Sequence, residues 1–273
     1  MMWARLRELW SYRELIRNLV ERDLKVRYKN SALGIAWSWL NPLLMMLVLT
    51  IVFTVMAAQN RQPAYHVSVL IGILAWNFFS ASVIGATGSI VNNAHLIKKV
   101  YFPRAALPVA VVIANMINFM IALPVFFALA WLSGVPLTGQ VWLIIWLPVV
   151  LLVQVIFTVG IGLILSTVNV FYRDTQIIME VVMLAWFFLT PIVYPIETVP
   201  QTATLLGAAF DLRRLVYIVN PMASIISSYR DVLYWGHTIG ADFFLRTAIT
   251  ALAMLVIGYA VFDRYARRFA EEV

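Results

Sequence analysis

Long uncharged runs alternate with short charged segments along almost the whole chain. A helix that crosses the ~30 Å hydrocarbon core of a bilayer needs about 20 apolar residues. Six runs of about that length occur, and we predict a transmembrane span in each. They lie at residues 32–58, 66–91, two within 105–172 on either side of a turn-rich break at 133–140, 177–194 and 243–262. The pattern predicts an all-α polytopic membrane protein with both termini on one side.

The positive charges indicate which side that is. Of the 20 Lys and Arg residues, 15 fall before the first span, in the loops at 92–104 and 171–176, or after the last span. Because cytoplasmic loops are enriched in Lys and Arg, we predict that both termini are cytoplasmic. The chain then forms one transmembrane domain, residues 1–273. It consists of a cytoplasmic arm (1–31), spans one to five (32–194), an outer segment (195–242), the last span (243–262) and a cytoplasmic tail (263–273).

Before the first span, one stretch has the periodicity of an amphipathic helix. Its apolar residues follow the i, i+3, i+4 spacing of a single helix face; they are Tyr12, Leu15, Ile16, Leu19 and Val20. A helix with a basic polar face joined to a membrane span favours a position flat on the membrane surface. The alternative is a helix packed against a partner protein.

Composition excludes several classes of function. The chain is 63% hydrophobic and 12% charged, so its net charge of +7 serves orientation and contact with anionic headgroups rather than nucleic-acid binding. It contains no cysteine and no Gly-x-x-x-x-Gly-Lys-Ser/Thr phosphate loop, and its three histidines are far apart in sequence. We therefore expect no metal and no ATP site in this chain. A membrane enzyme would need a convergent catalytic set, and the acids Asp174, Asp211 and Asp231 are isolated.

The loop at 92–104 is unusual because it combines lysines with aromatic residues. Burying Lys98 and Lys99 at mid-bilayer would cost roughly 2.5–3.5 kcal/mol each, so the segment must leave the membrane. Val100, Tyr101 and Phe102 nevertheless make it a poor free loop. An aromatic group rimmed by cations favours a protein pocket. The alternative is a basic turn that only sets the topology.

The outer segment at 195–242 is too long for a simple connector. Within it, Asn220 and Pro221 have the pattern of a helix start, and Gly236 that of a helix end. This helix is too short to cross the bilayer, so we predict that it dips into the outer leaflet or lies on it.

Five stretches together resemble the permease subunit of type-2 ABC exporters, in the branch that moves lipid-linked polysaccharides. They are ERDLKVRYKNSALGIAWSWLNPL at 21–43, LIKKVYFPRAALP at 96–108, NVFYRDT at 169–175, TPIVYP at 190–195 and NPMASIISSYRDVLYWG at 220–236. They occur in the order expected for that family and cover nearly the whole chain. The exported polymers of the branch are O-antigen, capsule and wall teichoic acid.

The resemblance implies a role for several sets of residues. The segment at 92–104 would dock on a separate ATPase through His95, Lys98, Lys99, Val100, Tyr101, Phe102, Pro103 and Arg104. An extracellular gate would include Asn220, Pro221, Tyr229, Arg230 and Asp231. A diphosphate headgroup would meet Arg22, Lys25, Arg27 and Lys29, although anchoring to bulk lipid explains the same four residues. Channel-lining aromatics would be Trp37, Trp39, Phe187, Phe188 and Tyr194, although such rings also serve as ordinary core.

The family also implies the assembly and its substrate. Two copies of the chain would form a conduit in the bacterial cytoplasmic membrane above two ATPase subunits, which would bind ATP and Mg²⁺. The substrate would be an undecaprenyl-diphosphate-linked glycan or polyol phosphate. A type-2 exporter of drugs or small lipids is the alternative, and the long segment before the last span favours polymer export.

Overall fold

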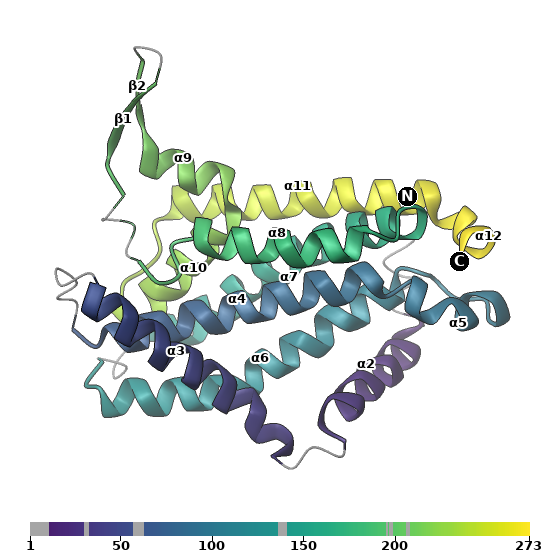
Figure 1. Ribbon diagram of the computed structural model, residues 1–273, viewed down its shortest axis with the longest axis horizontal. Helices are drawn as coiled ribbons and strands as arrows, with labels where there is room; N and C mark the ends of the chain where they lie inside the picture. The colour runs from purple at the N-terminus through teal and green to yellow at the C-terminus, as the bar shows by residue number, and fades with distance from the viewer. Residues whose placement is uncertain are drawn as a thin grey trace.

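The computed structural model describes residues 11–29, 33–56, 63–135, 141–194, 196, 199–205 and 208–273. Its long helices form one bundle, in which α4, α7 and α11 run roughly parallel and α3 and α6 slant across them (Figure 1). They are α3 (Trp37–Met56), α4 (Tyr65–Gly88), α6 (Ala106–Leu132), α7 (Val141–Phe171) and α11 (Ala241–Tyr265). Parts of the predicted arm, of the first span, of the break at 133–140 and of the outer segment lie outside the described residues.

Shorter elements occupy the two ends of the bundle (Figure 1). At the end that holds the C-terminus are the single turns η2 (Val91–Asn93) and η5 (Ala266–Arg268), α5 (Ala94–Lys99) and α12 (Phe269–Glu272). We call this the inner end. Helix α2 (Arg13–Tyr28) slants away from this end toward the single turn η1 (Gly34–Ala36), which precedes α3. At the opposite, outer end are the strands β1 (Thr202–Leu205) and β2 (Ala208–Asp211), α9 (Leu212–Val219), α10 (Pro221–Arg230) and a π-helical turn (Asp231–Trp235).

The predicted spans agree with the helices, with one difference. Within the described residues, five helices are long and apolar enough to cross a membrane, whereas the predicted fifth span is the 15-residue helix α8 (Thr175–Leu189). At 1.5 Å per residue α8 extends for only about 22 Å. The sequence TPIVYP that follows does not continue the helix, because its two prolines lack the amide N–H that helical hydrogen bonds need.

Helix α4 forms the centre of the bundle. It is apolar on all sides and buried over most of its length, as expected for a helix surrounded by others. Helices α3, α6, α7 and α8 and the outer helix α10 all contact it. The face of α3 away from α4 is exposed, as are Val181, Leu184 and Leu189 on α8. These exposed apolar faces suit lipid or another apolar protein surface.

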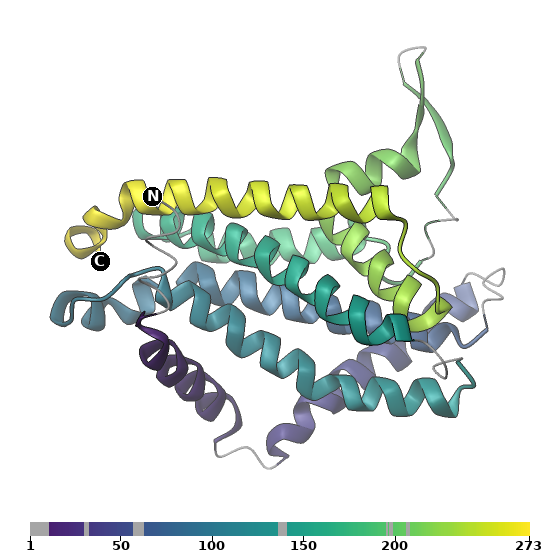
Figure 2. The same ribbon diagram turned by 180° about the vertical axis from the view of Figure 1, so that it is seen from behind.

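Helices α7 and α11 run side by side (Figure 2) and cross at two glycines. A Cβ atom added to Gly258 would lie 2.2 Å from the carbonyl oxygen of Gly160. One added to Gly160 would lie 2.6 Å from the carbonyl carbon of Met254. The two backbones are therefore in direct contact, which is how small residues promote helix association in membranes.

The arm packs on the protein at the inner end. Leu19 and Val20 on the apolar face of α2 are buried in a cluster with Phe102, Phe262 and Phe269 from other elements. This inner cluster joins α2, the segment at 92–104, the start of α6 and the end of α11. The predicted apolar face of the arm is thus an internal contact surface of this chain.

The β-hairpin was not predicted from the sequence. Strands β1 and β2 pair antiparallel, with Thr202 opposite Asp211, and the hairpin projects from the outer end beyond the helices (Figure 1). Asp211 then caps α9 by accepting a hydrogen bond from the backbone N–H of Arg214. The outer segment therefore contains the expected short helices and, in addition, a small sheet.

The α7–α11 crossing gives a first prediction. Gly258→Ala should lower the melting temperature of the purified protein, because the new methyl group must push the two backbones apart, at a cost of about 1–3 kcal/mol. The control is Ala253→Val, which adds volume at an exposed position on the same helix. Thermal unfolding followed by size-exclusion chromatography measures both. Equal melting temperatures for Gly258→Ala and the unsubstituted chain would contradict the crossing.

Candidate functional site

The chain leaves regular helix where α8 ends, and this break lies inside the bundle. Residues Thr190, Ile192 and Val193 are buried, yet the backbone here makes no helical ladder. A carbonyl group without a donor costs several kcal/mol in an apolar medium. The segment 190–194 therefore needs hydrogen-bond donors from elsewhere in the protein.

Arg230, at the end of α10, supplies most of those donors. Its Nη1 donates to the carbonyl of Pro191 at 2.6 Å, its Nη2 donates to the carbonyl of Ile192, and its Nε lies 3.4 Å from the carbonyl of Ser68 on α4. Gly72 leaves room for this arrangement, since a Cβ there would lie 3.2 Å from both Nη2 of Arg230 and the Ile192 oxygen. One guanidinium thus joins α10, α4 and the end of α8.

Tyr65 completes this network of donors by hydrogen bonding to the carbonyl of Val193. Three carbonyls in succession, those of residues 191, 192 and 193, consequently have donors from side chains of α10 or α4. We call this set of contacts the outer clamp. It lets non-helical backbone continue inside the bundle.

Asn220 fixes the other side of the same region. Its amide oxygen accepts from the backbone N–H of Ala223 and from the indole of Trp186, and its amide N–H donates to Thr190 at 2.8 Å. The predicted N-cap is therefore confirmed, and the same side chain ties the start of α10 to the end of α8. Pro221 occupies the first helical position and Gly236, with φ of 70°, ends the helical stretch, both as predicted.

The residues assigned to a gate are packed inside this chain. Tyr229 is fully buried, with its ring 5.7 Å from that of Phe119, and within the described residues its hydroxyl has no hydrogen-bond partner. Met222, Ile225 and Ile226 are buried as well. Asp231 lies beside a small pocket of about 80 Å³ that Arg230 and Tyr194 also line. In this conformation α10 is part of the core at the outer end.

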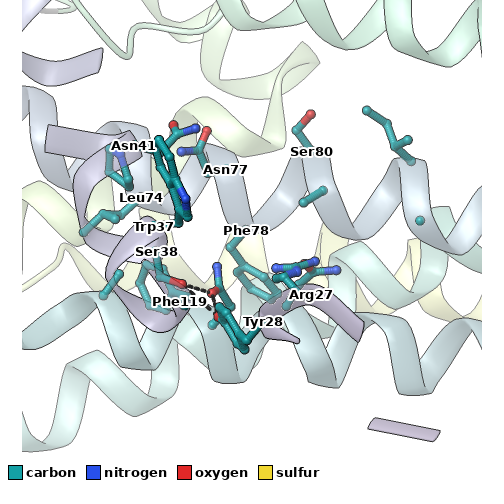
Figure 3. A pocket seen from close by; sticks show the side chains of 18 residues that line it. Arg27, Tyr28, Trp37, Ser38, Asn41, Leu74, Asn77, Phe78, Ser80 and Phe119 are labelled. Atoms are coloured by element: carbon teal, nitrogen blue, oxygen red, sulfur yellow. Dashed lines mark hydrogen bonds between the residues drawn. The ribbon is translucent and has the colours of Figure 1, made fainter. Parts of the chain in front are cut away.

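A larger cavity lies in the half of the bundle nearer α2. It has a volume of about 590 Å³, is open on one side, and is lined by the end of α2, η1, α3, α4 and α6 (Figure 3). Polar side chains from four helices line it; they are Arg27, Tyr28, Ser38, Asn41, Asn77, Ser80, Asn115 and Asn118. The rings of Trp37, Phe78 and Phe119 also contribute.

The four cations assigned to the headgroup have different surroundings. Arg27 lines the cavity and donates to Asn115 at 2.8 Å. Arg22 donates to Asn93 at 2.9 Å and pairs with Asp23, while Lys25 pairs with Glu21 at 3.6 Å. Lys29 is exposed just after α2. Of the four, Arg27 is the one that the structure brings to the cavity.

The aromatic residues assigned to a conduit are also dispersed. Trp37 lines the cavity, and the indole of Trp39 donates to the backbone carbonyl of Ile121 at 2.8 Å. Phe187 is buried against Trp76, with ring centroids 5.9 Å apart, whereas Phe188 is exposed. Tyr194 lines the small outer pocket. Whether these rings contact a substrate stays a prediction.

The segment at 92–104 has two distinct aromatic faces. Phe102 is buried in the inner cluster, while Tyr101 is 88% exposed and Val100 is 53% exposed. A cavity of about 300 Å³ separates the segment from the end of α11, with Arg104 and Asp263 among its lining residues. Burial lowers the pKa of the Arg104 guanidinium, and nearby Tyr101 has the opposite, smaller effect. His95, Lys98 and Lys99 are exposed on α5, and Pro103 is half-buried.

Sequence reasoning did not select the asparagines of the cavity. Asn41, Asn77, Asn115 and Asn118 lie within the predicted spans, where a polar amide costs free energy unless it has a partner or faces water. This free-energy cost was the sequence signal that could have identified the four asparagines as candidate site residues. Arg230 was selected, but as a residue of the outer gate rather than as the donor for the end of α8.

The model of the ABC-2 type transporter membrane family matches residues 14–234. The chain belongs to this family. It is 36% identical over 268 residues to the O-antigen export system permease protein RfbA of Myxococcus xanthus, a match that covers 98% of each chain. It is 33% identical over 259 residues to RfbA of Klebsiella pneumoniae, covering 94% of each. The polysialic acid transport protein KpsM of Escherichia coli is 22% identical over 249 residues.

Membership of the ABC-2 family confirms the predicted class of protein. The chain is a multi-pass membrane permease rather than an enzyme, and ATP is hydrolysed by a separate ATPase subunit with which an ABC-2 permease pairs. The family match at residues 14–234 covers the segment at 92–104, the cavity and the outer clamp.

The outer clamp gives a second prediction. Arg230→Met should destabilise the permease strongly, since two or three buried carbonyls would lose their donors at about 1–3 kcal/mol each. Arg230→Lys should restore little of the loss, because one ammonium group does not reproduce the planar fork that reaches separate carbonyls. The control is Arg214→Met, at an exposed position on α9. Thermal unfolding and protease resistance of the outer segment are measured, and full rescue by lysine would contradict the role of the fork.

Proposed function

We propose that this permease exports an undecaprenyl-diphosphate-linked polysaccharide across the bacterial cytoplasmic membrane. The proposal is carried by similarity over nearly the full length of the chain to permeases named for O-antigen export, at 32–36% identity. Among the polymers moved by such exporters, these relatives favour O-antigen over wall teichoic acid. The basic loops support an orientation with both termini in the cytoplasm.

The proposed assembly contains two copies of the permease and two ATPase subunits, which bind ATP and Mg²⁺. Tyr101 supports a docking role for the segment at 92–104, because an aromatic side chain that is 88% exposed beside Lys98 and Lys99 is typical of an interface anchor. Phe102 also supports the docking role, because its burial in the inner cluster fixes the segment to α2, α6 and α11. Force from an ATPase would therefore reach several helices at once.

The exposed apolar faces of α3 and α8 support pairing of two copies around a conduit. Helix α8 exposes Val181, Leu184 and Phe188, and most apolar side chains of α3 are exposed as well. In this arrangement α9 and α10 close the outer end, and the outer clamp holds α10 against α4. Export then requires the outer segment to move while its hydrogen bonds are retained or replaced.

A complementation experiment tests the proposed function. A bacterium that makes lipid-linked O-antigen but lacks its own permease receives this chain together with a cognate ATPase. We expect polymer on the cell surface, detected by an antibody that does not enter cells. The control ATPase carries a substitution of its nucleotide-binding lysine. Polymer retained inside cells that instead gain export of a hydrophobic drug would contradict the proposal.

The segment at 92–104 gives a third prediction. Tyr101→Ala should weaken co-purification of the ATPase by about tenfold, a loss of about 1.4 kcal/mol, and leave the melting temperature of the permease unchanged. Phe102→Ala should lower that temperature, because truncating a buried phenylalanine costs about 3–5 kcal/mol. Affinity purification and thermal unfolding of both variants are compared. If Tyr101→Ala binds ATPase normally and transports, the segment is a topological turn.

A further inference from the structure

We propose that the open cavity lined by α2, α3, α4 and α6 binds a sugar ring that carries a phosphate ester. The phosphate lies at Arg27 and the ring hydroxyl groups bond to Asn41 and Asn77. The inference rests on the proposed function, since the lipid-linked substrate supplies this chemistry where its first sugar joins the diphosphate. Of the four cations expected to meet a diphosphate headgroup, Arg27 is thus given a defined site, and the sugar next to the phosphate is given partners as well.

Two asparagines of the cavity have amide groups without a hydrogen-bond partner in the part of the chain that the structure describes. Asn41 on α3 and Asn77 on α4 are exposed, and neither makes a hydrogen bond within the described residues. Both lie within helices of membrane-spanning length, where an amide that faced lipid would cost several kcal/mol. Figure 3 shows both side chains at one end of the cavity. These groups are therefore available to a hydrogen-bonding ligand.

The composition of the cavity wall matches a phosphorylated sugar. None of the 18 lining residues is acidic, so no carboxylate repels a phosphate. Amide and hydroxyl groups, which both donate and accept, suit the hydroxyls of a sugar. The rings of Trp37, Phe78 and Phe119 provide flat apolar surfaces for its C–H groups. The volume of about 590 Å³ lies within the usual range for small-molecule sites, about 300–1,000 Å³.

Arg27 is oriented by the protein before any ligand binds. The amide N–H of Asn115 donates to the Val111 carbonyl at 3.0 Å, which turns the amide oxygen toward Arg27. That oxygen accepts one bond, at 2.8 Å, from the guanidinium Nη2. A guanidinium has five N–H groups, so others are left to form a bidentate pair with phosphate oxygens.

The wall that carries Arg27 is attached to the spans by a second set of hydrogen bonds. The hydroxyls of Tyr28 and Ser38 both donate to the amide oxygen of Asn118, the latter at 2.7 Å (Figure 3). Tyr28 ends α2, Ser38 lies in α3 and Asn118 lies in α6. The end of the arm is thereby held beside the cavity, and the cation does not depend on a free loop for its position.

The depth of the cavity fits a ligand that arrives from the inner surface. Asn115 lies nine residues after the start of α6, about 14 Å along the helix from the inner end. Asn77 lies eleven residues before the end of α4, a similar depth. The cavity thus extends from the end of the arm toward the middle of the bundle. A phosphate at this depth needs a fixed cation, which Arg27 provides.

Cysteine protection tests the site in the complete complex. Ala81→Cys places one thiol in the cavity wall of a chain that has no other cysteine. The permease with its ATPase is placed in nanodiscs and treated with a maleimide, with or without farnesyl-diphosphate-linked N-acetylglucosamine as the probe. At a concentration about ten times Kd, one-site binding should slow labelling by about tenfold. Thr238→Cys, exposed at the outer end, is the control thiol.

Substitutions in the cavity distinguish binding of the sugar from binding of the diphosphate. In the Ala81→Cys chain, Asn77→Leu should reduce protection by the sugar-linked probe to the weaker level given by farnesyl diphosphate and leave the latter unchanged, whereas Arg27→Gln should remove both. Matched controls are Asn18→Leu and Arg17→Gln, exposed on α2 and outside the cavity. Asn77→Ala replaces Asn77→Leu if the latter does not assemble. A purely structural role for Asn77 would reduce both kinds of protection together.

Comparison with bulk lipid identifies the source of the phosphate. Equal protection by phosphatidylglycerol at the same concentration would overturn the proposal and assign the cavity to ordinary lipid. Absence of protection by the sugar-linked probe, in a complex whose unsubstituted chain exports polymer in cells, would also overturn it and leave the proposed function standing. Failure of export by the unsubstituted chain would contradict the proposed function itself.

Discussion

Every backbone carbonyl inside a bilayer needs a hydrogen-bond donor, and this requirement explains the outer half of the structure. Helix α8 meets it internally as far as Leu189, but the prolines that follow prevent the helix from continuing. The donors come instead from Arg230 and Tyr65, on two other elements. The short helix α10 is consequently held in the core by the same bonds that make the end of α8 possible.

Several polar residues in the rest of the bundle meet the same requirement. Thr87, Thr158 and Thr167 each donate to the carbonyl four residues earlier in their own helix, and Gln154 donates across to the carbonyl of Ala75. These donor groups are satisfied inside the protein, although the amide oxygen of Gln154 has no hydrogen-bond partner within the described residues. Asn41 and Asn77 differ because no such partner is near them within the described residues. The distinction separates structural polar groups from those open to a ligand.

The sequence predicted the helices well because their signal is local. Uncharged runs, Pro221 after Asn220, and Gly236 at the end of a helix each reflect a property of a few adjacent residues. The clamp and the cavity could not be predicted in the same way, since Arg230 and Pro191, or Arg27 and Asn115, meet only after the helices have packed. The hairpin at 202–211 lacks a strong local signal, as its strands are short and contain several alanines. The length of α8 was overestimated because hydropathy continues past Pro191 although helical hydrogen bonding does not.

The path of the backbone after α8 also decides where α10 lies. Residues 190–194 form a turn and bends, and the carbonyls of Pro191, Ile192 and Val193 accept hydrogen bonds from side chains of other elements. If these residues coiled into helix, their carbonyls would turn toward amide groups of the same helix and away from Arg230 and Tyr65. The clamp therefore makes the local fold of five residues and the position of α10 depend on each other, so a change in one requires a change in the other.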